Sequence, residues 1–70
     1  MNLDFFDVID SDLVYTGMNQ YIIHKEGVDY VVDVTTLDEY GEAQEGSRYI
    51  SGSLSSAIAI IEALENGEDV

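Results

Sequence analysis

The sequence predicts an α+β fold, in which a small antiparallel sheet of three or four strands is covered by a C-terminal helix. Three observations support this prediction. Residues 21–35 have the β-branched and aromatic composition of a hairpin, and apolar residues recur at helical spacing between residues 54 and 64. The chain has 70 residues, of which 46% are hydrophobic, and this suits one small core and a single domain over residues 1–70.

The N-terminal residues 2–10 are expected to form a short helix. Asn2 can cap such a helix, and Phe5 and Val8 would then lie on one apolar face. Residues 12–16 follow as a short strand, because they are rich in residues that favour extended backbone.

The hairpin consists of residues 21–25 and 28–35, joined by Glu26-Gly27 as a two-residue turn. One face of it is apolar and is expected to face the core, whereas the other face is mixed and acidic. The expected register pairs Ile23 with Tyr30 and Tyr21 with Val32 on the core face, and His24 with Asp29 on the opposite face.

The C-terminal helix is expected to begin after Ser53, a good N-cap, and to end before Gly67. Its apolar stripe comprises Leu54, Ala57, Ile58, Ile61 and Leu64. We expect this stripe to cover the apolar face of the hairpin. Between hairpin and helix lie a polar loop, residues 38–46, and a short strand, residues 48–51. A loop of that length is a candidate for function in so small a domain.

The charge of the chain excludes several functions. Fifteen carboxylates face two basic residues, Lys25 and Arg48, and the formal net charge is −13. Self-repulsion at this charge lowers stability, so we expect the charge to serve the function. It argues against direct binding to nucleic acid or to an anionic membrane, because both require Lys and Arg to neutralise phosphates. An acidic N-terminus lacks the basic residues of a signal peptide, so we expect a cytoplasmic protein.

Catalysis and metal binding have little support, and we expect neither an enzyme nor a cofactor. His24 is the single imidazole and Cys is absent, so no nucleophile stands in a recognised pattern beside a base. Asp10-Ser11-Asp12 begins like a calcium loop, but Val14 occupies a position where an oxygen ligand belongs. No metal site is therefore expected.

The carboxylates are spaced in rows. Steps of two or three residues separate Asp4, Asp7, Asp10 and Asp12, and steps of three separate Glu39, Glu42 and Glu45. Asp29 and Asp33 stand four apart on one strand face, roughly 13 Å at 3.3 Å per residue. Such rows would imitate the dense negative charge of nucleic-acid phosphates. We expect the partner-binding residues to be Asp7, Asp10, Asp12, Asp29, Asp33, Asp38, Glu39, Glu42 and Glu45. Neutralising the four loop carboxylates from Asp38 to Glu45 should then stabilise the fold.

In size, charge and expected architecture, the whole chain resembles the small, strongly acidic inhibitors encoded by phages and other mobile elements, such as anti-CRISPR and anti-restriction proteins. The resemblance implies a DNA mimic that acts in the cytoplasm of an infected bacterial host. Its partner would be a basic nucleic-acid-binding protein, a subunit of a CRISPR or restriction effector, whose Arg and Lys residues the carboxylates would bind.

Two other interpretations remain open. An immunity or antitoxin protein that neutralises a basic toxin would use the same charge, but would depend on an aromatic anchor such as Tyr40 or Tyr49. An acidic homo-oligomeric module would pack helix on helix through the edge formed by Ala59 and Ala63. We therefore expect a monomer or a small homo-oligomer.

Overall fold

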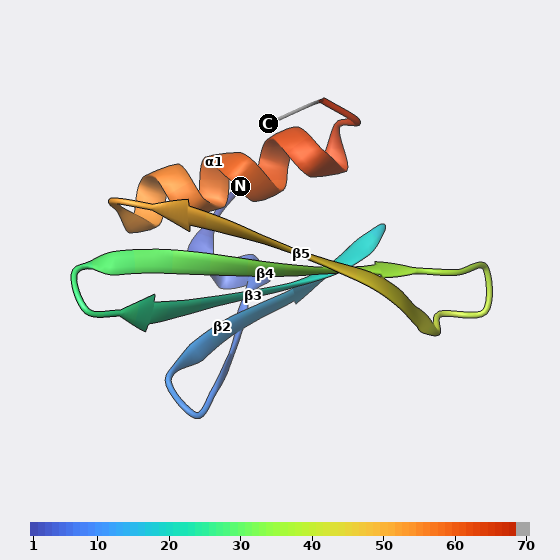
Figure 1. Ribbon diagram of the computed structural model, residues 1–70, viewed down its shortest axis with the longest axis horizontal. Helices are drawn as coiled ribbons and strands as arrows, with labels where there is room; N and C mark the ends of the chain where they lie inside the picture. Colours follow the sequence, from blue (N-terminus) through green and yellow to red (C-terminus); the bar gives the residue numbers. More distant parts are fainter. Residues whose placement is uncertain (69–70) are drawn as a thin grey trace.

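The computed structural model describes residues 1–68 and confirms the α+β class, with a five-stranded antiparallel sheet followed by one helix (Figure 1). In chain order, the elements are the 3-10 turn η1 (Leu3–Phe5), the strands β1 (Asp7–Ile9), β2 (Asp12–Thr16), β3 (Asn19–Glu26), β4 (Asp29–Leu37) and β5 (Ala43–Ser51), and the helix α1 (Leu54–Glu65). The strands lie side by side in sequence order, so the sheet is a meander. α1 lies along one face of this sheet.

The core fills the space between α1 and the sheet face that it covers. The buried core residues are Phe6, Tyr21, Ile23, Val32, Val34, Ala57 and Ile61. Leu54, Ile58 and Leu64 pack against them, so the predicted helical stripe is confirmed. Both helix ends are confirmed as well, because the Ser53 hydroxyl accepts the backbone N–H of Ser56 at 3.2 Å and Gly67 has a φ of 77°.

The β3–β4 hairpin forms with a register two residues away from the predicted one. The observed pairs include Glu26 with Asp29, Ile23 with Val32 and Tyr21 with Val34. The turn is therefore Gly27-Val28, and Gly27 has a φ of 63°. A glycine at the first central position is typical of a type II′ turn, whereas the prediction placed it second. A shift of two residues leaves every side chain on its face, so the predicted core face is right while His24 faces Val31 instead of Asp29.

The predicted N-terminal helix over residues 2–10 is wrong. Only Leu3–Phe5 form a single 3-10 turn, which Asn2 caps, and the chain then pairs with β2 as the strand β1. The backbone φ is 51° at Asp10 and 71° at Ser11, and two successive positive values close a tight hairpin of type I′. The pairing of β1 with β2 thus replaces the helix, and the sheet gains a strand beyond the three or four expected.

The strand β5 is longer than the predicted strand over residues 48–51. It begins at Ala43, so the connection from β4 shortens to residues 38–42. Glycine disfavours strands, yet Gly46 pairs with Thr35 of β4. Pairing with a neighbouring strand outweighs the weak local preference here.

Candidate partner-binding surface

The sheet face turned away from α1, which we call the open face, carries several carboxylates. Side chains alternate between the two faces of a strand, so the register assigns each residue to one face. The open-face carboxylates are Asp7, Asp12, Glu26, Asp29 and Asp33. Asp29 and Asp33 therefore share a face, as predicted. No element of residues 1–68 packs over this face.

One line of residues crosses the open face from edge to edge. The register aligns Asp7, Val14, Ile22, Asp33 and Arg48 on the five successive strands. Carboxylates thus stand on the outer strand β1 and on β4, next to the opposite edge strand, with apolar side chains between them. This alternation gives the open face both charge and contact area.

Two side chains, Arg48 and His24, contact carboxylates of the open face. Asp33 accepts a hydrogen bond from Arg48 Nε at 3.0 Å, and its other oxygen lies 2.9 Å from His24 Nε2. Glu26 Oε2 lies 3.5 Å from His24 Nδ1 and 3.9 Å from Arg48 Nη1. Asp33 and Glu26 therefore have partners within the chain. Within residues 1–68, the other three open-face carboxylates take part in no ion pair.

The predicted pairing of His24 with Asp29 is wrong, because the two-residue shift in register brings Asp33 and Glu26 to the imidazole instead. The sequence did not reveal this network, since it depends on how β5 brings Arg48 beside β4. No group of three His, Asp or Glu side chains within residues 1–68 has a geometry that could hold a metal ion.

The centre of the open face is apolar. Val14, Ile22 and Val31 lie there, and Val31 is only 3% exposed although no helix covers it. Ile50 is paired with Val31 and is 66% exposed. An apolar centre with a charged rim is the usual composition of a protein-binding surface.

The β4–β5 loop is organised by Asp38. One of its carboxylate oxygens accepts the backbone N–H groups of Tyr40 at 2.8 Å and Glu42 at 2.9 Å, and the other accepts Gln44 Nε2 at 3.0 Å. Asp38 thus closes the loop, so the expectation that its neutralisation would stabilise the fold is not supported. Glu39 and Glu42 are exposed in the same loop.

The nine predicted partner-binding residues fall into two groups. Asp7, Asp10, Asp12, Asp29 and Asp33 lie on the open face or in the β1–β2 turn at its end. Asp38, Glu39 and Glu42 lie in the β4–β5 loop at the opposite end of the sheet, and Glu45 lies in β5 (Figure 1). The helical row from Asp4 to Asp12 does not form, because its residues belong to η1, two strands and a turn.

Sequence reasoning missed a contact that joins the end of α1 to the β2–β3 turn. Glu65 accepts a hydrogen bond from the hydroxyl of fully buried Tyr21 at 2.5 Å and from the backbone N–H of Met18 at 3.0 Å. Burial, together with the hydrogen bond to Glu65, raises the pKa of Tyr21 to about 12. A Cβ at Gly17 would lie 1.9 Å from Glu65 Oε1, so a larger residue there would displace the carboxylate from its present position.

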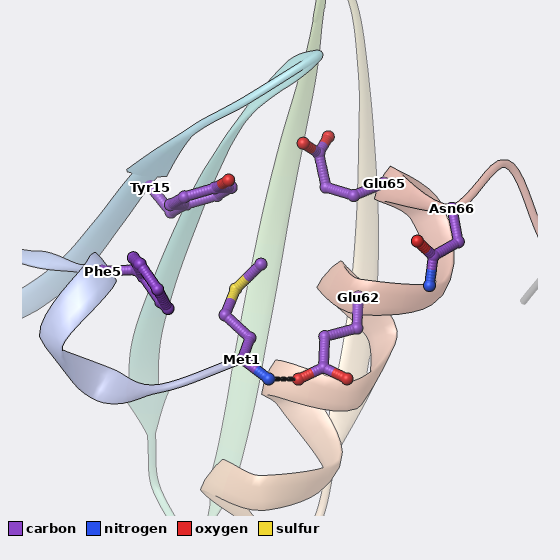
Figure 2. A pocket seen from close by; sticks show the side chains of 6 residues that line it. All are labelled: Met1, Phe5, Tyr15, Glu62, Glu65 and Asn66. Atoms are coloured by element: carbon purple, nitrogen blue, oxygen red, sulfur yellow. Dashed lines mark hydrogen bonds and ion pairs between the residues drawn. The ribbon is translucent and has the colours of Figure 1, made fainter.

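A hollow of about 320 Å³ lies between the N-terminal segment and the last turns of α1 (Figure 2). Its lining residues are Met1, Phe5, Tyr15, Glu62, Glu65 and Asn66. The amino group of Met1 contacts Glu62, and the carboxylate of Glu65 binds Tyr21 and Met18. Both carboxylates of the hollow are therefore already paired, and we place the candidate functional site on the open face.

No family model, curated protein or solved structure matches this chain. In the described residues, the one α-helix is too short to cross a membrane.

Proposed function

We propose that this protein is an acidic inhibitor that imitates nucleic acid and blocks the nucleic-acid-binding surface of a CRISPR or restriction effector. It would act by direct protein binding in the cytoplasm of an infected bacterial host. One observation supports this proposal above the others, namely that five carboxylates share a sheet face that no other described element covers.

The dimensions of the open face suit a groove that holds nucleic acid. Asp29 and Asp33 are four residues apart on β4, or about 13 Å, and Asp7 lies three strand spacings from Asp33, or about 14 Å. These separations are comparable with the width of a DNA major groove, about 12 Å. Arg and Lys side chains that bind phosphates on the two sides of a groove would meet carboxylates at similar separations.

The charges also support fast and selective binding. A net charge of −13 attracts a basic groove over distances of about 8–10 Å at physiological salt. Asp7, Asp12 and Asp29 are free of ion pairs within residues 1–68, so a partner can bind them without displacing an internal cation. Each exposed pair contributes only about 0–1 kcal/mol, so the affinity depends on several pairs acting together.

The test is a binding series against an effector recovered by affinity capture from a host lysate. Single changes, Asp12→Asn or Asp29→Asn, should weaken binding about threefold each, and the double variant about tenfold or more. The matched double control, Glu39→Gln with Glu68→Gln, removes the same charge away from the open face. Added duplex DNA should compete with the protein for the effector. Equal losses in both double variants, or no competition by DNA, would contradict the proposal.

An immunity-type interface is the second candidate, because two large side chains are exposed beside the carboxylates. Tyr40 is 82% exposed in the β4–β5 loop, and Ile50 projects from the open face. Tyr49 packs against the core and is a poorer anchor than the sequence suggested. If Tyr40→Ala or Ile50→Ala costs about 2 kcal/mol or more while the double carboxylate variant binds normally, this second function replaces the first.

A further inference from the structure

The outer edge of β5 is the one long strand edge that residues 1–68 leave open. β5 has nine residues and pairs only with β4, whereas the strand at the opposite edge, β1, has three. Residues 43–48 are all exposed. The unpaired N–H and C=O groups of such an edge are a template for another strand.

β5 has few of the features that normally protect an edge. Short length, Lys, Pro and bulges are the common devices. β5 contains neither Lys nor Pro, and its irregular pairing with β4 is confined to the beginning of the strand, before Gly46. From Gly46 to Ser51 the ladder is regular, so the outer edge of this segment is straight enough to pair.

The charge of β5 is balanced, in contrast to the rest of the chain. It carries one acid, Glu45, and one base, Arg48, while the other 61 residues carry fourteen acids and one base. Two copies of this protein therefore repel each other least when they approach through β5. Ile50, at the same edge, offers apolar surface to the contact.

We propose that two copies of this chain pair through their β5 edges in antiparallel fashion, about a two-fold axis perpendicular to the sheet. Such an isologous contact pairs the outward backbone groups of both strands and creates one sheet of ten strands. The axis keeps both copies of α1 on one side and both open faces on the other. The pairing itself does not depend on the proposed inhibition.

The dimer would also join the acidic open faces of the two copies into one longer surface, and the use of that surface rests on the proposed function. Three strand spacings, about 14 Å, separate Asp7 from Asp33 within one copy. Three further spacings separate Asp33 from Asp33 of the second copy, since two β5 strands lie between the two β4 strands. Carboxylates would thus recur every 14 Å or so across about 43 Å, more than one DNA turn of about 34 Å.

The dimer is expected to be weak and to strengthen with salt. Two paired strands of nine residues bury less than the ~1,600 Å² of a standard interface. Each copy also carries a net charge of −13, and this repulsion is screened as the Debye length shrinks from about 30 Å at 0.01 M salt to about 3 Å at 1 M.

Sedimentation equilibrium over a range of salt concentrations tests the pairing. The dissociation constant of the wild-type dimer should fall about tenfold or more between low and high salt. Ser47→Glu places two carboxylates at the centre of the proposed contact and should abolish the dimer. Ala59→Glu adds the same charge on the exposed helix edge, the alternative surface for self-association. At high salt, where the added repulsion is screened, its dimer dissociation constant should stay close to that of the wild type.

A wild-type protein that stays monomeric at high salt would overturn the proposal, as would a dimer that Ala59→Glu disrupts and Ser47→Glu does not. Amide hydrogen exchange of the wild type needs no variant, and β5 amides should exchange more slowly as the protein concentration rises. A protein that stays monomeric but still binds its effector would contradict the proposed dimer and not the proposed function. A protein that dimerises but binds no effector would contradict the proposed function and not the dimer.

Discussion

Glu65 is a residue at which two physical arguments predict opposite effects of the change Glu65→Gln. A carboxylate in the last turn of a helix interacts unfavourably with the helix dipole, and the whole chain is strongly negative. Charge alone therefore predicts that neutralising Glu65 stabilises the fold by about 0.3–1 kcal/mol. The contacts of Glu65 with Tyr21 and Met18 predict the reverse.

The contacts should outweigh the charge. A hydrogen bond to a charged group contributes about 1.5–3 kcal/mol, and the Tyr21 hydroxyl that donates it is buried. The second contact, from the backbone of Met18, is exposed and contributes less. Gln keeps the shape of the side chain and one acceptor oxygen but loses the charge. After the electrostatic gain is subtracted, we expect Glu65→Gln to lower the free energy of unfolding by about 1–2 kcal/mol.

Urea denaturation, followed by far-UV circular dichroism, measures this difference without the screening that guanidinium salts introduce. The control is Glu68→Gln, which removes the same charge from an exposed residue just beyond the helix and should raise stability slightly or leave it unchanged. If Glu65→Gln is as stable as Glu68→Gln, the contact does not hold the helix end to the β2–β3 turn, and the reasoning is refuted.

Three further variants test other parts of the structure. Asp38→Asn should lower the melting temperature in thermal denaturation experiments, because the carboxylate accepts three hydrogen bonds in its loop. A higher melting temperature would mean that relief of charge repulsion outweighs these hydrogen bonds. Ile61→Ala should cost about 2–5 kcal/mol in urea denaturation, since Ile61 is fully buried against the sheet; a loss below about 1 kcal/mol would contradict its place in the core. The pKa of the Tyr21 hydroxyl is about 12 in the folded protein and about 10 when unfolded. The neutral hydroxyl therefore contributes about 2–3 kcal/mol to the free energy of unfolding, which is complete below pH 10 and is lost as the pH rises to 12. Tyr21→Phe should flatten that part of the stability profile, and an unchanged slope would exclude this role.

The sequence was sufficient to predict the fold class and the faces of its main elements. Period-2 alternation assigned the core face of β3 and β4, and the 3.6-residue stripe assigned that of α1. The register was missed because Gly27 fits either position of a two-residue turn, and the pairing of Glu26 with Asp29 is what places it first. The N-terminal segment was misassigned because a few apolar residues fit a helix face, whereas pairing with β2 decides their structure.

The candidate site was predicted in part for the same reasons. Asp29 and Asp33 share a face whichever of the two registers forms, so their placement was secure. The contacts of Asp33 with His24 and Arg48 depend on the actual register of three strands, and the sequence alone does not supply it. The sequence predicts Asp38 as a recognition group, because it shows a charge but not the backbone N–H groups around it.

The meander order of the sheet also determines how the chain is expected to fold. Three of its four strand connections have two residues and the fourth has five, so closing each loop costs little entropy. Chains dominated by such local contacts fold faster than those that must join distant segments. The contact of Glu65 with Tyr21 spans 44 positions and is therefore expected to form late. Changes at Glu65 should therefore speed unfolding more than they slow folding, while the acidic face of the sheet is assembled from the earliest pairings.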